Sequence, residues 1–231
     1  MNDIMKQIIT FMLAATACVP QVSAQWSVGL EAGATRNSLH VDKSYAYDRH
    51  YKPRWGFTMG IPVRYDFNGW FGLQSGLSLA CKNYDIERGW QYADNRYRFS
   101  NTFLDIPVFA RFRFGGHRLH GYLLAGGYLG AWLRSNVAGR QMAYFDHELE
   151  YGTYEFDDKV EFDSRRDNRF DAGLAVGLGL QYELSHHVGI FAEARYYYGL
   201  TDMQKHYMRG QFSRYSNTML FQAGAMYEFN K

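Results

Sequence analysis

The chain has 231 residues, a length that suits one domain, and its 19 Tyr, 17 Phe, 23 Gly and only 4 Pro favour strands over helices. Its 25 basic and 23 acidic side chains are mixed along the chain and leave a net charge of +2, so nucleic acid is not an expected partner. Mean hydropathy is −0.40, and no run of about 18 apolar residues follows the N-terminal segment, which excludes a membrane-spanning helix and leaves a closed barrel as the membrane-spanning option.

Residues 1–24 have the layout of a secretory signal peptide. Lys6 precedes an apolar run at residues 8–15, and the small residues Ser23 and Ala24 end the segment before Gln25. A basic start, an apolar middle and a small-residue cleavage site are typical of an export leader. We therefore expect cleavage between Ala24 and Gln25, and an exported mature protein.

Other interpretations of this segment stay open at the level of sequence. It could be a core strand or helix of a soluble domain, although it lies very close to the N-terminus. It could also be a lipoprotein signal lipidated on Cys18, although Ala15 stands where a lipobox usually has Leu. Translation is expected to start at Met5 rather than Met1, because the acidic Asp3 weakens the basic start.

From Gln25 onward, apolar residues recur at every second position, which is the period of a strand. Eight strands are predicted in this way. In chain order they cover residues 26–34, 55–67, 71–81, 104–114, 119–133, 170–182, 188–198 and 221–229. The segment 119–133 is apolar on both faces, so the period alone does not fix its register.

The connections between these strands alternate in length. Short turns are expected at 68–69, 115–118 and 185–187, and Asn68-Gly69 is a strong hairpin signal. Long loops are expected at 36–54, 84–101, 135–167 and 201–216. Strands of roughly a dozen residues with short turns at one end and long loops at the other are typical of transmembrane barrels. The sequence predicts an all-β fold: an eight-stranded antiparallel up-and-down barrel over residues 25–231, integral to the outer membrane, with both termini periplasmic.

The faces of the strands opposite the large apolar side chains carry charged residues and glycines. Ten charged side chains are expected to point into the barrel: Glu31, Arg64, Asp105, Arg111, Arg113, Asp171, Glu183, Glu193, Arg195 and Glu228. Isolated charges are costly in a low-dielectric lumen, so we expect them to pair as arginine–carboxylate bridges. The network is interpreted as a structural plug, since side chains alone can fill an eight-stranded barrel. A path for protons or small ions is the alternative.

Three internal segments of the strands form recognisable motifs: Phe103-Leu104-Asp105-Ile106-Pro107-Val108, Leu124-Ala125-Gly126-Gly127-Tyr128-Leu129-Gly130 and Ala194-Arg195-Tyr196-Tyr197-Tyr198-Gly199-Leu200-Thr201. Together they resemble the PorT-like outer-membrane β-barrel family of Bacteroidota. The resemblance covers essentially the whole mature chain. It implies an outer-membrane location and a barrel fold, while a family member's role in protein secretion does not transfer by fold alone.

The C-terminal strand resembles the signal that barrels present to the outer-membrane insertion machinery. The matching residues are Gln222, Gly224, Tyr227 and Phe229, followed by Asn230 and Lys231, where many barrels end on the aromatic residue itself. We therefore expect the insertion machinery as a partner during biogenesis.

The long loops are the expected contact surface, because binding residues concentrate on loops held by a rigid scaffold. The first loop carries aromatic and charged residues at 45–51, and the third is acidic over 146–163. Expected partners are membrane lipid and lipopolysaccharide, and a protein or glycan through the loops. The acidic loop is interpreted as a solvated hairpin extension, with a divalent-cation site as the alternative.

No catalytic, cofactor or metal residue is predicted. Asp48 with His50, or Asp146 with His147, could form an acid/base pair, but no nucleophile motif accompanies either. The adjacent His186 and His187 lie in a short turn and are interpreted as turn residues. A structural or interaction barrel is the first hypothesis, with a narrow channel and a PorT-like secretion role as alternatives.

Overall fold

The computed structural model describes residues 25–41, 49–88, 95–116, 118–144, 151–205 and 212–229. Ten strands form one antiparallel sheet: β1 (Gln25–Val41), β2 (Arg49–Asp66), β3 (Phe71–Cys81), β4 (Tyr84–Arg88), β5 (Arg96–Gly115), β6 (Leu119–Tyr144), β7 (Tyr151–Lys159), β8 (Phe170–Glu183), β9 (Val188–Gly199) and β10 (Arg214–Glu228). Among the described residues, no helix is long and apolar enough to cross a membrane.

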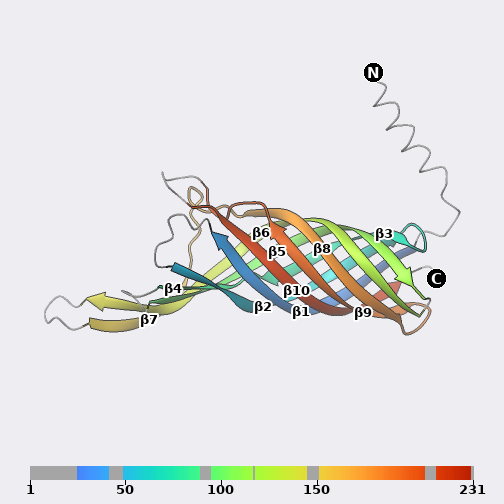
Figure 1. Cartoon of the computed structure of the whole chain (residues 1–231), viewed down its shortest axis with the longest axis horizontal. Coiled ribbons are helices and arrows are strands. Elements are labelled where there is room, and N and C mark those ends of the chain that lie inside the picture. The colour runs from blue at the N-terminus through green and yellow to red at the C-terminus, as the bar shows by residue number, and fades with distance from the viewer. Residues whose placement is uncertain are drawn as a thin grey trace, which may run out of the picture.

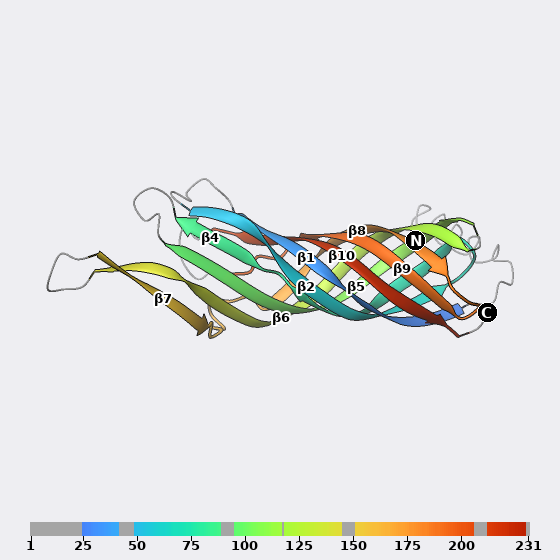
Figure 2. The ribbon, with the colours of Figure 1, turned by 90° about the horizontal axis from the view of Figure 1, so that it is seen from below.

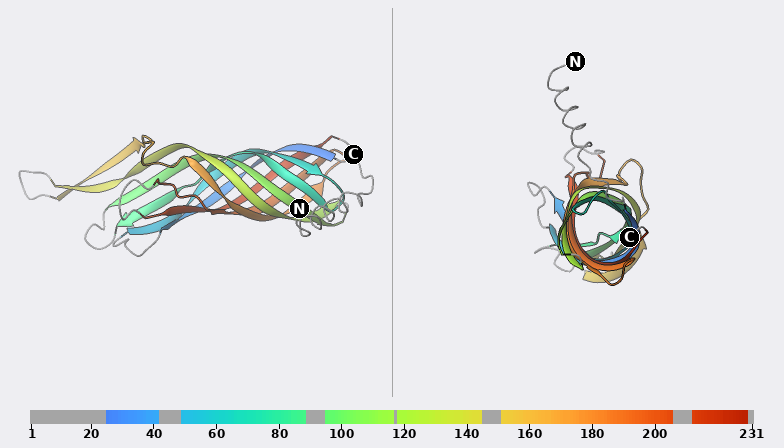
Figure 3. Two further views of the ribbon diagram at one scale, coloured as in Figure 1. Left: turned by 90° about the horizontal axis from the view of Figure 1, so that it is seen from above. Right: turned by 90° about the vertical axis from the view of Figure 1, so that its right-hand side faces the viewer.

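The sheet closes into a barrel with eight strand positions. β3 and β4 both lie between β2 and β5, and β7 and β8 both pair with β6 at different heights, so the ten strands occupy eight places around the ring. The first and last strands pair from Ser27↔Glu228 to Val41↔Arg214, which closes the wall seen end-on in Figure 3. The predicted fold class is confirmed.

The barrel is a long tube with the short turns at one end, where β1 begins and β10 ends (Figure 1). Short turns mark the periplasmic end of such barrels, so the long connections lie on the extracellular side. In the part of the barrel nearer the periplasmic end, large apolar side chains point outward, among them Leu30, Leu178 and Leu180 at 68%, 60% and 59% exposure.

Aromatic side chains gather at both ends of this apolar belt. Near the periplasmic turns, the ring of Tyr65 contacts those of Trp26 and Phe67, with centroid distances of 4.7 and 4.8 Å. At the other end, Trp55 lies 6.2 Å from Phe221. Aromatic girdles at the two membrane interfaces are typical of outer-membrane barrels.

The structure fixes the register of residues 119–133, which the period alone could not decide. Tyr122, Leu124 and Tyr128 are buried inside the barrel, whereas Leu123 and Leu129 face outward. At Leu133 the pairing with β5 shifts by one residue, since Phe103 pairs with Trp132 and Thr102 pairs with Arg134.

The four long connections are shorter than predicted, because strands continue beyond the apolar belt. β1 runs on to Val41, β10 begins at Arg214, β4 and the start of β5 lie within 84–101, and the end of β6 and β7 lie within 135–167. The acidic connection therefore contains a strand hairpin, which projects beyond the rest of the barrel in Figure 2.

The strands above the belt were interpreted as loops because their hydrophobic pattern is reversed. In β1, the inward side chains are polar low in the barrel, as at Glu31, and apolar at the top, as at Leu39. The outward side chains change in the opposite sense, from Leu30 to the exposed His40. The alternation persists, but lipid gives way to water outside the wall.

Candidate functional site

The lower part of the lumen is filled by a network around Arg64 on β2. Its guanidinium donates hydrogen bonds to Gln74 Oε1 at 2.8 Å and, across the barrel, to Gln181 Oε1 at 2.7 Å. Arg111 on β5 donates to the same Gln181 oxygen at 2.9 Å and to Asp66 Oδ1 at 3.2 Å. The amide of Gln181 thereby joins β8 to β2 and β5, and Gln74 adds β3 through Arg64.

A second group of charges lies above this one and centres on Arg195 of β9. Two hydrogen bonds join its guanidinium to the two carboxylate oxygens of Glu31 on β1, at 2.8 and 3.3 Å. It also contacts Glu193, which accepts a hydrogen bond from Tyr122 Oη at 2.8 Å. Arg195 is 3% exposed, so these carboxylates supply the partners that a buried guanidinium requires.

The uppermost charged group is built on Lys82, which lies in the break between β3 and β4. Its Nζ is 3.0 Å from Asp105 Oδ2 on β5 and 2.8 Å from Asp171 Oδ2 on β8. Tyr128 Oη and Thr201 Oγ1 donate to the other oxygen of Asp171 at 3.3 and 3.0 Å. Lys82 is 1% exposed, so its ammonium group closes the bore between two carboxylates.

Aromatic side chains fill the space between the charged groups. Tyr128 and Tyr197 stack at 4.5 Å between their ring centroids, and Phe109 lies 6.4 Å from Tyr197. Lys82 Nζ is 4.6 Å from the ring centre of Tyr128, and the Arg111 guanidinium is 4.4 Å from that of Tyr122. The lumen is thus packed with rings and cations together, where a network of charges alone was expected.

The inward glycines make room for these rings. A Cβ at Gly179 would lie 2.4 Å from Tyr122 Cζ, and one at Gly173 would lie 2.8 Å from Tyr128 Cε1. Both contacts are closer than carbon atoms can approach, so the small residues are needed where an aromatic ring crosses the bore.

Eight of the ten predicted inward charges are buried: Glu31, Arg64, Asp105, Arg111, Asp171, Glu193, Arg195 and Glu228. Arg113 and Glu183 are partly exposed near the periplasmic turns. There Arg113 donates to the carbonyl of Gly69 at 2.8 Å, and Glu183 accepts from Gln181 Nε2 at the same distance. The network therefore includes the periplasmic mouth as well as the interior.

Sequence reasoning missed Lys82 because it follows the last residue of β3 and lies outside every predicted strand. The strand alternation breaks at Lys82 and Asn83, both of which are buried, so the period gave no inward position for the lysine. The one available signal was the unequal number of predicted inward acids and arginines, six against four, which calls for another cation.

The residues of the C-terminal motif divide between the two faces of β10. Gln222 is buried in the lumen, and Tyr227 and Phe229 point outward with ring centroids 5.3 Å apart. A Cβ at Gly224 would lie 2.8 Å from Phe191 Cζ. The role of these residues as an insertion signal stays a prediction.

An apolar cluster fills the barrel above the belt. Its buried members are Leu39, Val41, Tyr84, Phe103, Trp132 and Met203. Phe103 and Trp132 stack at 5.6 Å, directly above the lysine group, since Lys82 Nζ is 4.6 Å from the Phe103 ring centre. The bore is therefore filled above Lys82 as well as below it.

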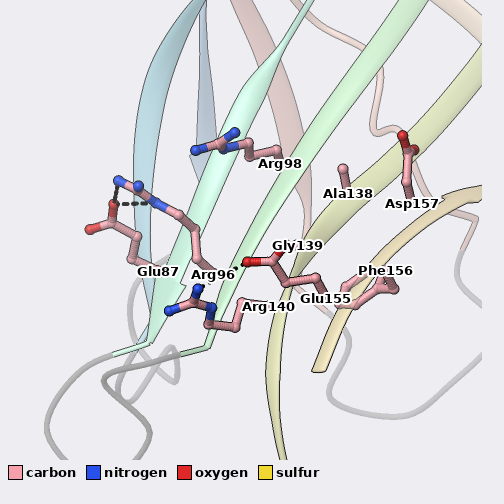
Figure 4. A pocket seen from close by; sticks show the side chains of 9 residues that line it. All are labelled: Glu87, Arg96, Arg98, Ala138, Gly139, Arg140, Glu155, Phe156 and Asp157. Atoms are coloured by element: carbon pink, nitrogen blue, oxygen red, sulfur yellow. Dashed lines mark hydrogen bonds and ion pairs between the residues drawn. The ribbon is translucent and has the colours of Figure 1, made fainter. Parts of the chain in front are cut away.

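A charged depression of about 860 Å³ lies on the sheet outside this cluster (Figure 4). Its rim carries Arg96, Arg98, Arg140, Glu87, Glu155 and Asp157 around the small Ala138 and Gly139, with Phe156 beside them. Arg96 pairs with Glu87, and Arg140 donates to Glu155 at 2.9 Å. Within the described part of the chain, Arg98 and Asp157 form no ion pair.

Two carboxyls in this extracellular part have shifted pKa values. Hydrogen bonds from Lys52 and Arg96 hold the pKa of Glu87 below its ordinary value of 4.5. Partial burial raises the pKa of Asp167, but hydrogen bonds from Arg166 and from the backbone N–H of Asp163 outweigh burial and lower it below 3.8. Both side chains are thus ionised at neutral pH.

The other predicted sites are placed only in part. His50 is exposed on β2 opposite Glu87, and His186 and His187 lie in the β8–β9 turn. Residues 1–24, with the cleavage residue Ala24, and Asp48, Asp146 and His147 lie outside the described residues, as does most of the aromatic first loop. Among the described residues, no group of three or more His, Cys, Asp or Glu side chains could hold a metal ion.

Comparisons with known proteins agree with this architecture. A family model described as outer membrane protein beta-barrel domain matches residues 19–205. Among solved structures, the outer membrane protein OprG from Pseudomonas aeruginosa is 12% identical, with 90% of this chain and 97% of that chain covered and a TM-score of 0.51. Ail, the attachment invasion locus protein of Yersinia pestis, is 17% identical, with 88% and 98% covered and a TM-score of 0.41.

Neisserial surface protein A is 14% identical, with 87% of this chain and 97% of that chain covered and a TM-score of 0.45. A comparison with curated proteins found no match. At these identities the OprG match shows a shared fold alone, while the family model covers well over half of the chain. The apolar belt, the filled lumen and the family match together place the protein in the outer membrane as an integral β-barrel. The chain belongs to the outer membrane protein beta-barrel domain family.

Proposed function

We propose that this barrel is closed to solutes and that it acts through its extracellular part, as a structural or interaction protein. The observation that carries the proposal is that side chains from opposite walls meet across the bore at successive heights. Arg64 on β2 reaches Gln181 on β8, and Lys82 joins Asp105 on β5 to Asp171 on β8. Each of these five side chains is at most 6% exposed.

The same contacts weigh against the narrow channel that is the main alternative. An ion crossing the bore would have to displace the ammonium of Lys82 from both carboxylates, and below it the stacked rings of Tyr128 and Tyr197. Breaking a buried ion pair by removing one partner typically costs about 3 to 5 kcal/mol. A barrel of eight strands needs no more than its own side chains to fill its interior.

Conductance across a planar bilayer tests the closed bore. The wild-type barrel is expected to insert without conductance steps. The double variant Tyr128→Ala/Tyr197→Ala, which removes the stacked pair and keeps every lumen charge, is expected to give small steps. Protease protection of the inserted protein verifies insertion in both cases. Regular conductance steps from the wild-type barrel would contradict a closed bore and favour the narrow channel.

We assign no catalytic activity to the barrel. His50 is exposed and lies opposite Glu87, and no nucleophile motif accompanies it. A hydrolytic or group-transfer activity of the purified barrel that is lost in His50→Ala or His147→Ala would contradict the assignment of a non-enzymatic role. A PorT-like role in protein secretion stays a prediction. It is tested by comparing the proteins secreted by wild-type cells with those secreted by cells that lack this chain.

Exposed arginines lie at the level where the barrel leaves the membrane. Directly above the belt, the exposed Arg36 lies over the ring of Trp55 at 5.8 Å, and the exposed Arg134 follows Leu133 on β6. Guanidinium groups recognise phosphate well, so we assign lipopolysaccharide contact to this level. Contact with a protein or glycan is assigned to the strands farther out.

A further inference from the structure

β7 is the open edge of the sheet. It pairs with β6 from Asn136↔Lys159 to Tyr144↔Tyr151 and with no other described strand. Each of the other nine described strands pairs along both of its edges. Figures 1 and 2 show the β6–β7 hairpin projecting past the other strands. An open edge presents unpaired N–H and C=O groups to any extended segment that reaches it.

The two faces beside this edge differ in chemistry. On one face, Tyr154 is 46% exposed, and its ring lies 6.0 Å from Phe156, which is 5.9 Å from Tyr97 on β5. On the other face lie Glu155 and Asp157, which belong to the charged depression of Figure 4. Successive side chains of a strand point to opposite faces, so one added strand would meet both surfaces.

The charge of β7 selects among possible occupants. Glu155 and Asp157 share their face with Lys159, and Asp158 lies on the face of Tyr154 and Phe156, so the strand carries three negative charges and one positive, a net charge of −2. A second copy of the chain, paired edge to edge, would bring a second strand of net charge −2 beside this one, and the repulsion between two strands of like charge destabilises such a pair. The acidic edge thus opposes self-association and leaves a basic segment as the complementary partner.

We propose that β7 binds an extended segment of another protein by strand addition, and that basic residues alternate with apolar residues in that segment. The basic side chains lie over Glu155 and Asp157, and the apolar side chains lie over Tyr154 and Phe156. Backbone hydrogen bonds to the open edge supply affinity, and the two faces supply specificity. This inference rests on the proposed extracellular interaction role and is independent of whether the bore is closed.

The test uses the full mature barrel refolded in zwitterionic dodecylphosphocholine micelles, with fluorescent peptides as probes. One peptide alternates Lys and Val, and a second has the same composition with all Lys residues in one block. Fluorescence anisotropy is expected to show binding of the alternating peptide at least about tenfold tighter than the block peptide, because the block peptide cannot place its charges on one face. Hydrogen exchange of the β7 amides is expected to slow when the alternating peptide binds.

Backbone methylation separates strand addition from simple charge attraction. Two further alternating peptides carry N-methyl groups on all Lys residues or on all Val residues. An added strand turns every second N–H toward its neighbour, so one of these peptides must lose binding while the other keeps it. Equal binding of both methylated peptides, or equal binding of the alternating and block peptides, overturns the proposal.

A matched pair of variants tests the acidic face. Asp157→Lys is expected to weaken binding of the alternating peptide by about three- to tenfold, the range of an opposed charge pair turned into a like pair. Glu161→Lys makes the same charge change at an exposed residue just beyond β7, and it is expected to leave binding unchanged. Equal effects of the two variants, or a wild-type dimer by sedimentation velocity, would also overturn the proposal. If the wild-type barrel conducted ions and still bound the alternating peptide, the closed bore would be wrong and strand addition at β7 would stand.

Discussion

At the scale of single residues, Lys82 matters because both carboxylates that its ammonium group contacts are buried. Asp105 and Asp171 are 0% and 6% exposed, and the lysine supplies the cation that both carboxylates contact. Within the described residues neither carboxylate forms a salt bridge with any other side chain. A buried charge that loses its partner is far more costly than an exposed one.

Lys82→Met should therefore lower the free energy of unfolding by about 3 to 5 kcal/mol, measured by urea titration of the barrel in lipid vesicles. Lys52→Met is the matched control, since Lys52 is half exposed and pairs with Glu87 outside the membrane. That control should cost less than about 1 kcal/mol. Equal costs for the two variants would contradict the assigned bridge.

Glu87 gives a stability contribution that depends on pH. Because its pKa is lowered in the folded protein by hydrogen bonds from Lys52 and Arg96, its contribution is full above the ordinary value of 4.5 and is lost as the pH falls through the folded value. Glu87→Gln should thus be less stable than wild type at neutral pH, with the difference shrinking below pH 4.5. Urea titrations along a pH series measure it, and a difference independent of pH would contradict the linkage.

At the scale of elements, the strands show how one alternation serves two environments. In β5, outward side chains change from Ile106 and Val108 within the belt to Arg96 and Arg98 above it. The strand keeps its direction and its pairing with β6 throughout, apart from the shift at Thr102 and Phe103. The reversal of polarity therefore marks the membrane surface along β5, as it does along β1.

Leu178→Arg tests which face of β8 meets lipid. Leu178 is 60% exposed near the middle of the strand, and a charge at that depth on the lipid face should destabilise the barrel by about 2 to 4 kcal/mol. Ser38→Arg, at an outward position of β1 above the belt, should change stability by less than about 0.5 kcal/mol. Unfolding in lipid vesicles measures both. An unaffected Leu178→Arg barrel would show that this face does not meet hydrocarbon.

At the scale of the whole molecule, the barrel has two interiors of opposite character. Inside the belt, where the outer surface is apolar, the core consists of charges and rings, as in the group around Arg195. Above the belt, where the outer surface is polar, the core is the apolar cluster around Phe103 and Trp132. Each part buries the class of side chain that its surroundings would not solvate.

The sequence by itself determined the strand period, the facing of most side chains and the class of fold, because alternation along one strand is a local property. It also indicated which charges would point inward, as at Arg64 and Arg195. It missed the strands above the belt, where the polarity is reversed, and the inward position of Lys82, where the alternation breaks.

The tertiary structure alone decided which charges meet across the bore and which edge stays open. The pairing of Arg195 with Glu31 joins residues 164 positions apart, and that of Lys82 with Asp171 joins residues 89 apart. Such contacts depend on the register of every intervening strand pair and on closure of the ring, and no local pattern encodes either. The open edge of β7 follows from the same cause, since it exists only because β6 changes partner from β8 to β7 above the belt.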